Sequence, residues 1–438
     1  MTNFTYSIPA LEQLKKSDPQ IFDALMHEEV RQSEGIELIP SENYCFPEVY
    51  ALLGSVFNNK YSEGYPGRRY YGGQENTDII ENLARDRAKA LFHAEYANVQ
   101  PLSGSPMNQA VYFGLLNPGD TILGMDLSHG GHLTHGAPVS HMSKVFNFIR
   151  YKTEIPSGKI DFDKVRALAQ EHKPKMILCG FSSYPRELDY ASFKKIADEI
   201  GAITFADVSH IGGLIAGGAL KNPMDFGFDV MTTTTHKSLR GPRGGMIVAK
   251  KEHGPKLDKS VFPGLQGGPH MHQVAAVATT LKLASEPAFK TYAQNVITNA
   301  KTLAATLMEN NAHLITGGTD NHMMVMDTVT SPCAITGDVA EKALDAAGIT
   351  LNKQMIPDDP NPPLKPSGIR LGTPAATARG MGEKEMKQLG KIMLQALNAA
   401  SDAATLAKLH EETKAICKGF PVPGVTAENP LESKAKAA

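Results

Sequence analysis

The 438-residue chain has few cysteines, no long apolar run and almost no net charge. Its four cysteines form no CxxC pair, which is typical of reduced thiols, and stand at Cys45, Cys179, Cys333 and Cys417. No apolar stretch is long enough for a bilayer, and residues 1–8 lack the basic-then-apolar order of a signal peptide. A formal net charge of −2 attracts no polyanion, so we expect a cytoplasmic protein without nucleic acid or membrane as a main partner.

Two common nucleotide-binding signatures are also missing, because the chain contains neither GxxxxGK[ST] nor GxGxxG. What the chain does contain is ordinary for a globular protein. Hydrophobic residues make up 42% and charged residues 21%, a balance that allows a large buried core. The length is that of about two typical domains, and we therefore expect two.

The middle of the chain alternates short apolar runs with amphipathic segments. Residues 175–180 and 202–207 have the composition of buried strands, and residues 189–200 between them have a helical pattern that stops at Gly201. Strand, helix and strand at this spacing predict a right-handed crossover and a mainly parallel sheet. Further strands are expected at residues 229–235 and 245–249, so the fold class is α/β.

The expected division is an N-terminal arm and helix over residues 1–34, a large domain over 35–290 and a small α/β domain over 291–438. The boundary follows a break in a long helical pattern at Glu286-Pro287. The small domain is expected to combine a strand at 322–327 with helices at 338–347 and 383–398. The small and charged residues from about 422 onward are expected to fray.

Several polar residues fall where predicted strands end. Asp207 closes one apolar strand, and Lys237 closes the threonine-rich strand that opens "TTTTHKSLRGPRGG" (residues 232–245). The turn Ser103-Gly104-Ser105 lies between a strand-like and a helix-like segment. Because ligands of parallel sheets bind beyond the carboxyl ends of the strands, we expect these residues to share a site.

Together these residues match the needs of pyridoxal phosphate. A small-residue turn at a helix N-terminus can hold a phosphate, a buried Asp can pair with the pyridine nitrogen, and a desolvated Lys near arginines can form a Schiff base. Each signal alone has a plainer interpretation, since Lys237 could be a solvated surface lysine, Ser-Gly-Ser a simple turn and Asp207 a helix cap. Their joint order favours the cofactor without excluding these alternatives.

Three further blocks are unusual. "HGGHLTHG" (129–136) carries three histidines, but no acid or cysteine lies within the block, so we expect no metal and favour an imidazole stacked on a cofactor over core packing. "NKYSEGYPGRRYYGG" (59–73) is either a surface loop with a turn at Pro66-Gly67 or a binding site or subunit contact around Glu63. Arg370 in "SGIRLGTP" suits bidentate capture of a carboxylate.

These blocks, together with "IELIPSEN" and "FPGLQGGP", resemble serine hydroxymethyltransferase in order and nearly in spacing over residues 10–420. The resemblance implies the aspartate-aminotransferase-like fold (fold type I of the pyridoxal phosphate-dependent transferases), with a mainly parallel seven-stranded sheet and a smaller C-terminal α/β domain. It implies a homodimer, or a tetramer, with shared active sites. The implied reaction transfers the hydroxymethyl carbon of serine reversibly to tetrahydrofolate, giving glycine and 5,10-methylenetetrahydrofolate through an external aldimine of pyridoxal 5′-phosphate.

The resemblance also implies roles in cofactor binding. Lys237 would form the internal aldimine, Asp207 would pair with the pyridine nitrogen and His132 would stack on the ring. The phosphate would be held by Ser103, Gly104, Ser105 and His236, with the backbone of Gly268 supplied by the neighbouring subunit.

Other residues would bind the substrates. The cofactor's O3′ and the amino acid would contact Ser182, His210, Ser41 and Arg370, of which Arg370 grips the carboxylate. The partner chain would supply Tyr61, Glu63 and Tyr71, with Tyr61 also contacting the cofactor and Glu63 moving protons at the hydroxymethyl group and at folate. The pterin pocket would include Leu127, Gly131, Leu133 and Gln354, the last standing where the family commonly has Asn.

Three alternatives stay open. The chain could be a relative that cleaves β-hydroxy amino acids without folate, such as a threonine aldolase, or a hydroxymethyltransferase that prefers α-methylserine. A different class is a catalytically silent binding protein, which the intact Lys237 argues against. Folate-dependent transfer rests on the loop around Glu63 together with the glycine-histidine block.

Overall fold

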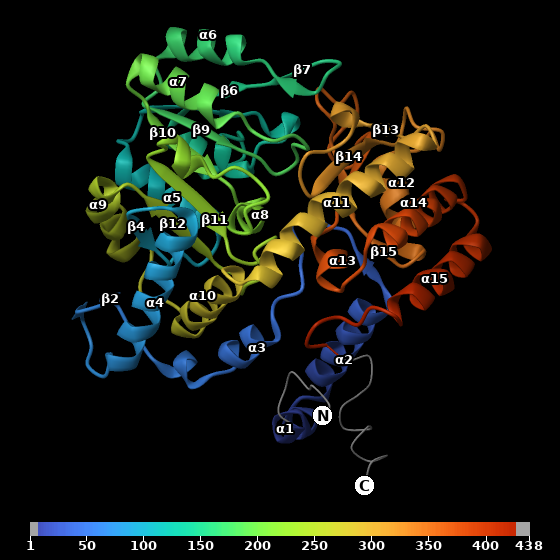
Figure 1. The fold of residues 1–438 in the computed structure, drawn as a ribbon, viewed down its shortest axis with the longest axis horizontal. Coiled ribbons are helices and arrows are strands. Elements are labelled where there is room, and N and C mark those ends of the chain that lie inside the picture. Colours follow the sequence, from blue (N-terminus) through green and yellow to red (C-terminus); the bar gives the residue numbers. More distant parts are fainter. Residues whose placement is uncertain (1–7, 426–438) are drawn as a thin grey trace.

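The structure, a computed structural model, describes residues 8–425 and builds them around two hydrophobic cores (Figure 1). The larger part contains a seven-stranded sheet in the order β4-β12-β11-β10-β9-β5-β6. Its strands are β4 (Tyr96–Asn98), β12 (Gly245–Ala249), β11 (Val230–Thr234), β10 (Ile203–Asp207), β9 (Met176–Gly180), β5 (Thr121–Met125) and β6 (Asn147–Tyr151). All neighbours are parallel except at β12, which is antiparallel to both of its partners, so the mainly parallel α/β fold is confirmed.

The apolar strands of this sheet are buried on both faces. The large part has one core cluster on each face of this sheet. In β9, Met176 and Leu178 face the first of these clusters, whereas Ile177 and Cys179 face the second. This alternation follows from the two-residue period of a strand, and the absence of a wet face explains why the run is continuously apolar. The predicted crossover helix is α7 (Tyr190–Ile200), which Asp189 caps and Gly201 ends with φ +69°.

Helices cover the two faces of this sheet (Figure 1). One face packs against residues of α5 (Gly104–Leu115) and α9 (Gly254–Lys259). The other face packs against residues of α4 (Glu75–Phe92), α6 (Phe162–His172), α7 and α10 (Met271–Ala284). The sheet therefore forms the middle layer of three, with its carboxyl-end loops free to build a site.

The C-terminal part has its own core around a four-stranded antiparallel sheet in the order β13-β14-β17-β16. These strands are β13 (His313–Leu314), β14 (Met323–Asp327), β17 (Gly368–Gly372) and β16 (Asn352–Gln354), and the helices are α12 (Gly337–Ala346), α14 (Glu383–Asn398) and α15 (Ala403–Cys417). The long helix α11 (Pro287–Glu309) runs between the two parts and contributes Val296 to one core and Leu303 to the other (Figure 1). One helix, which begins close to the boundary predicted near residue 290, thus contributes to both cores. The division into domains stays a prediction.

The N-terminal helices α1 (Ile8–Ser17) and α2 (Pro19–Glu34) lead into a strand that joins the C-terminal part. This strand, β1 (Ile36–Glu37), pairs in parallel with β15 (Ile349–Thr350), although the predicted division places residue 36 in the large domain. At the other end, Val422 is buried beside Tyr44, and the rest of the tail that we expected to fray, residues 426–438, lies outside the described residues.

The remaining elements are short or peripheral: α3 (Pro47–Leu53), β2 (Gly64–Tyr65), β3 (Arg68–Arg69), β7 (Thr153–Glu154), β8 (Lys159–Ile160), α8 (Gly212–Ala216) and α13 (Pro374–Ala378). The hairpin of β2 and β3 turns at Pro66-Gly67, where Gly67 has φ +76°, in the loop predicted to bind or to contact a subunit. Among the described residues, no helix has both the length and the hydropathy that crossing a bilayer requires.

Candidate active site

A cavity of about 510 Å³ opens beyond the carboxyl ends of β9, β10 and β11. Parallel strands bring their carboxyl ends to one edge, which is where ligands of such sheets bind. Eleven of the predicted site residues line this cavity: Ser41, Ser103, Gly104, Ser105, His132, Ser182, Asp207, His210, His236, Lys237 and Arg370. The fold therefore brings together residues that are up to 329 positions apart in the chain (41 to 370).

Asp207 is buried at the end of β10 and is held by four hydrogen bonds. One carboxylate oxygen accepts from Asn108 Nδ2 at 2.8 Å and from His135 Nε2 at 3.0 Å. The other accepts from the backbone N–H and the hydroxyl of Ser209, at 3.0 and 2.6 Å. Burial by itself raises the pKa of Asp207, but these donors, led by His135, outweigh it and leave the pKa well below its usual range. The cavity thus has a permanent negative charge at its base.

The two histidines nearest Asp207 have assigned tautomers. The backbone N–H of His132 donates to His135 Nδ1 at 3.2 Å, so the proton of the neutral His135 ring lies on Nε2, which donates to Asp207. In the same way, His132 Nδ1 accepts from the backbone N–H of Thr134 at 3.2 Å. Burial, with the neighbouring His135, lowers the pKa of His132 to about 4, and its ring is therefore neutral near pH 7.

Lys237 follows β11 and is partly exposed to the cavity. Burial lowers the pKa of its amine to about 8; Asp207 opposes this shift, and Arg370 and Arg243 reinforce it. Of the two arginines in the glycine loop, only Arg243 lines the cavity. Arg240 instead lies over the rings of Phe46 and Tyr292, with its guanidinium carbon 4.5 and 5.1 Å from their centroids. The structure therefore assigns one arginine to the site and the other to packing.

The far end of the cavity is built for an anion. Helix α5 begins there, and because the side chain of its N-cap residue Ser103 makes no capping hydrogen bond, the first N–H groups of the helix stay available. Among residues 8–425, His236 Nδ1 is buried without a hydrogen-bond partner. A buried imidazole nitrogen without a partner, beside a free helix N-terminus and Arg243, fits a phosphate group, and the residues present therefore fit pyridoxal phosphate.

Arg370 points toward the cavity from β17 and is held in a fixed orientation. Its Nε donates to Asn352 Oδ1 at 3.1 Å and its Nη1 donates to the carbonyl of Ser182 at 2.7 Å. Burial lowers the pKa of the guanidinium to about 10, so it stays charged at neutral pH. With Nε and Nη1 held by the protein, Nη2 is left to bind a carboxylate.

Behind Arg370 and Lys237 lies a buried pair of imidazoles. His210 Nδ1 is 3.3 Å from His322 Nε2, and the two rings are 5.5 Å apart. Burial lowers the pKa of both rings, in His322 to about 3, and the nearby cations Lys237 and Arg370 add to the effect. Two neutral rings can share one hydrogen bond here, which two charged rings could not.

Four predicted site residues lie elsewhere in the chain and do not line this cavity. Tyr61 and Tyr71 are 57% and 50% exposed, and their rings are 5.4 Å apart at 74°. A Cβ added at Gly268 would come within 2.9 Å of the Tyr61 ring, and Glu63 reaches the adjacent Gly267. Tyr61, Glu63, Tyr71 and Gly268 therefore form one cluster, which we call the tyrosine-glutamate loop cluster, on the surface of the chain.

The residues expected around the pterin are also outside the cavity. Leu127 and Leu133 are 38% and 49% exposed in two short 3₁₀ helices that flank Gly131. Gln354 lies in β16, where its amide donates to the carbonyl of Met355. These roles stay predictions.

A contact between His129 and Asp358 ties these two regions together. His129 Nε2 is 3.1 Å from Asp358 Oδ1, which joins the loop of Leu127 and Leu133 to the segment after Gln354. The loop that we expected at the pterin is thereby fixed against the C-terminal part.

The fold brings Asp207 to the histidine block. Ligand atoms of His132, His135 and Asp207 all lie within 4.8 Å of one another, a spacing that a metal site would allow. Here, however, the Nε2–H of His135 donates to Asp207, and this use of the ring nitrogen competes with a metal bond. We assign the three residues to one hydrogen-bonded network.

Sequence reasoning missed several partners of the predicted residues: Asn108, Thr134, His135, Ser209 and His322. Three of them stood in recognised segments, because Thr134 and His135 belong to the glycine-histidine block and Ser209 follows Asp207 by two positions. Asn108 could have been suspected as a polar residue in the buried face of a predicted helix. We find no local signal that would have revealed His322.

Comparisons with known proteins agree with this geometry. A family profile described as serine hydroxymethyltransferase matches residues 14–393. A curated serine hydroxymethyltransferase from Desulfotalea psychrophila is 52% identical over 416 residues, which cover 95% of this chain and 97% of that protein. Proteins of the same name from Koribacter versatilis and Acidobacterium capsulatum are each 50% identical over 411 residues, covering 94% of this chain and 96% of theirs.

Proposed function

Because the chain belongs to the serine hydroxymethyltransferase family, we propose that its Lys237 cavity binds pyridoxal 5′-phosphate and there passes the hydroxymethyl carbon of serine to tetrahydrofolate. Hydroxymethyl transfer from serine is the activity of this chain, and the reaction leaves glycine. The observation that carries the cofactor assignment is the convergence, in one cavity, of a lysine with a lowered pKa, an ionised buried acid and an anion cradle.

When bound, the cofactor supplies an electron sink for the carbon–carbon bond that breaks in serine. Asp207, as a carboxylate, would keep a proton on the ring nitrogen. Ser103, Ser105 and His236 would hold the phosphate, together with the N–H groups at the start of α5. His132 would lie against the ring, since its neutral imidazole can stack without charge repulsion from Lys237.

Lys237 and Arg370 would handle the amino acid. With a pKa of about 8, an appreciable fraction of the molecules carries Lys237 as a free amine near neutral pH. This amine can accept a proton from the amino group of serine or return one to it. Arg370, held by Asn352 and Ser182, would bind the serine carboxylate through its free Nη2. Ser41 and His210 line the same end of the cavity and would complete the amino-acid site.

The tyrosine-glutamate loop cluster supports a shared site in a homodimer. Tyr61 and Tyr71 are exposed in one chain, and Glu63, the acid expected to move protons at the hydroxymethyl group, does not line the Lys237 cavity. A two-fold contact would let each loop reach the partner's cavity, so that Glu63 of one subunit serves the other subunit's serine and folate. Leu127, Gly131, Leu133 and Gln354 would then border the pterin. A cytoplasmic location is part of this proposal and is supported by four free cysteines.

The shared site can be tested by mixing two impaired variants. In a Lys237→Ala and Glu63→Gln mixed dimer, one site carries both changes and the other carries neither. Co-expression should therefore restore about a quarter of the wild-type sites, measured as serine- and tetrahydrofolate-dependent turnover, although each variant alone is impaired. Turnover no higher than the average of the two separate variants would contradict the shared site.

The cofactor assignment has its own test. The purified chain loaded with pyridoxal 5′-phosphate should have a visible absorption band that changes when glycine and tetrahydrofolate are added. Lys237→Ala should lack the starting band, because the covalent link to the lysine is gone. A colourless wild-type chain that stays colourless with the vitamin would contradict the proposal.

A further inference from the structure

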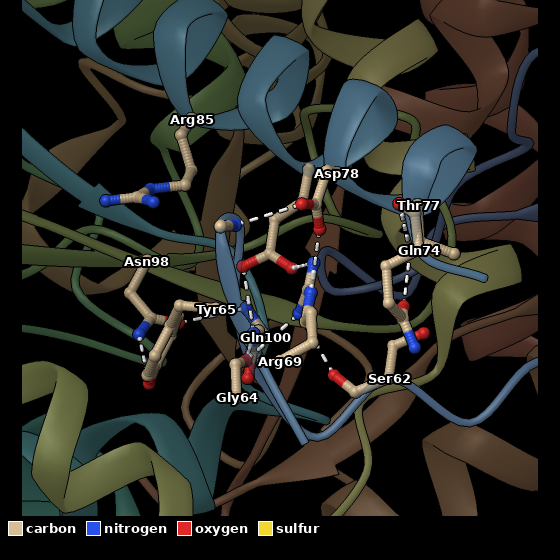
Figure 2. A network of polar contacts seen from close by, with 12 residues as sticks. Ser62, Gly64, Tyr65, Arg69, Gln74, Thr77, Asp78, Arg85, Asn98 and Gln100 are labelled. Carbon is tan, nitrogen blue, oxygen red and sulfur yellow. Dashed lines mark hydrogen bonds and ion pairs between the residues drawn. The ribbon is translucent and has the colours of Figure 1, made fainter. Parts of the chain in front are cut away.

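The backbone on both sides of Glu63 is held at four successive carbonyls. Gln74 Nε2 donates to the carbonyl of Tyr61 at 3.0 Å, and the backbone N–H of Tyr70 donates to that of Glu63 at 3.1 Å. A single guanidinium nitrogen, Arg69 Nη1, donates to the carbonyl of Ser62 at 2.9 Å and to that of Gly64 at 3.0 Å. Arg69 therefore bridges the carbonyls of Ser62 and Gly64, the two residues that flank Glu63 (Figure 2).

Arg69 is itself fixed by helix α4, which runs across the top of Figure 2 above the loop. Its Nη2 is 2.7 Å from Glu81 Oε2, and its Nε is 2.9 Å from Asp78 Oδ1. The side chains of Arg69 and Glu81 are only 3% and 1% exposed, so this ion pair is buried. All three nitrogens of the guanidinium have partners, two toward the helix and one toward the loop, and rotation of the side chain would break several hydrogen bonds at once.

Gln100 adds a second support from below the loop. Its Nε2 donates to the carbonyl of Gly64 at 2.9 Å and to Glu81 Oε1 at 2.8 Å. The backbone carbonyl of Gln100 accepts from Gln266 Nε2 at 3.0 Å. Gln266 Oε1 in turn accepts from the backbone N–H of Leu102, next to the phosphate turn. The loop is thus attached to the same rigid segment that leads to Ser103.

The exposed surface of this loop makes such support necessary. Tyr61 and Tyr71 are 57% and 50% exposed, and Gly64 has φ +93°, at which a Cβ would lie 2.4 Å from the carbonyl oxygen of Arg68. The backbone around Glu63 is therefore held by the polar contacts of Gln74, Arg69 and Gln100. A lost contact would let the carboxylate move without unfolding the chain.

We propose that Arg69 is a positioning residue for the hydroxymethyl-transfer step: with Glu81 and Gln100 it clamps the peptides around Glu63 and aims that carboxylate at the partner subunit's cavity. The inference rests on the role proposed above for Glu63. Arg69 acts through Glu63 and touches neither serine nor folate. Because a small displacement of a proton-transfer group slows the reaction strongly, the clamp affects kcat more than serine binding.

The test uses the full-length chain with the cofactor bound. Arg69→Met/Glu81→Met removes both charges together, which avoids the penalty of leaving Glu81 buried without a partner and keeps the fold. We expect kcat to fall about tenfold to a hundredfold with the KM for serine and the cofactor content nearly unchanged. When the same pair of changes is added to Glu63→Gln, kcat should fall little further, because the carboxylate that the clamp positions is already absent.

Two single variants complete the test. Arg68→Met is the matched control, since Arg68 is the neighbouring arginine with a 73% exposed side chain and a 3.4 Å ion pair to Asp258; its kcat should stay within about twofold of wild type. Arg69→Lys keeps the charge but cannot serve two carbonyls and two carboxylates at once, so kcat should remain low. Full activity in Arg69→Lys, or an equal loss in Arg68→Met, would overturn the clamp.

The outcomes separate the two proposals. Wild-type kcat in Arg69→Met/Glu81→Met, beside an impaired Glu63→Gln, overturns the clamp and leaves the role of Glu63 standing. Losses that multiply when the variants are combined also overturn it, since Arg69 would then act independently of Glu63. An unimpaired Glu63→Gln overturns the role of Glu63 itself, and the clamp with it.

Discussion

The Lys237 cavity and the tyrosine-glutamate loop cluster have opposite constructions. Asp207 ends a strand and Lys237 follows one, both strands are almost entirely buried, and the side chains that shift the pKa values of these two residues come from the same chain. Glu63 lies on a surface loop, where buried polar contacts hold the backbone and the side chains of Tyr61 and Tyr71 are exposed. A sheet edge thus provides the proposed cofactor site, whereas the function proposed for the loop is to serve the cavity of a second chain.

The difference also separates two physical effects. In the cavity, burial changes the chemistry of the groups, because it lowers the pKa of Lys237 to about 8 and of His132 to about 4. In the loop, burial acts on the residues that support the backbone. It raises the pKa of Glu81, and the neighbouring Arg69 opposes this shift. We therefore expect a change at Lys237 to alter the cofactor and changes in the loop to alter the turnover alone.

The largest effect is expected at Lys237. Lys237→Ala should remove multiple turnover, with kcat lower by about a thousandfold or more, together with the visible absorption of the bound cofactor. Lys221→Ala, at a lysine whose side chain is 63% exposed, is the control and should keep both. Retained absorption in purified Lys237→Ala would show that another group holds the cofactor.

Arg370→Ala should come next and should separate substrate binding from cofactor binding within the same cavity. Loss of a buried carboxylate contact costs on the order of 2–4 kcal/mol, so the KM for serine should rise roughly 30- to 800-fold. The cofactor content should hardly change, because Arg370 is held by Asn352 and Ser182 and not by the phosphate end. A serine dependence equal to wild type would refute the role of Arg370.

A pH profile tests the electrostatics of the cavity directly. The neutral amine of Lys237 is the reactive form, so cofactor-free chain should recombine with pyridoxal 5′-phosphate faster as the pH rises, with a midpoint near its pKa of about 8. Asp207 stabilises the protonated amine, and Asp207→Asn should therefore move the midpoint to lower pH. A midpoint that stays the same or rises in Asp207→Asn would contradict this arrangement.

The smallest effect is expected in the loop. Tyr61→Phe keeps the ring that contacts Tyr71 and Gly268 and removes only the hydroxyl. One neutral hydrogen bond contributes about 0.5–1.5 kcal/mol, so kcat/KM should fall by about tenfold or less. The cofactor content should equal that of wild type. A lower cofactor content in Tyr61→Phe would contradict the expectation that changes in the loop alter the turnover alone.

Much of the cavity could be predicted because its residues end local patterns. The run before Asp207, the threonines before Lys237 and the turn at Ser103 each mark the end of a strand or the start of a helix. Periodicity also located α7 and α14 to within a residue of their bounds. Such features depend on neighbours in the chain, which a single sequence contains.

Other features depend on residues that meet only in the fold. His135 reaches Asp207 across 72 positions, and His210 reaches His322 across 112. The pairing of β1 with β15 spans more than 300 residues, and the reversed direction of β12 follows from its tight return from β11. No spacing rule indicates such partners, since they are selected by the packing of whole layers.

By itself the sequence determined the alternation of strands and helices, the positions of the lysine and the acid at strand ends, and a resemblance that names the reaction. The tertiary structure alone decided which donors keep Asp207 ionised, which of the loop arginines faces the cavity, and that Arg69 lies beneath Glu63. The reason is physical: backbone patterns are set by neighbours along the chain, whereas pKa values and orientation are set by neighbours in space.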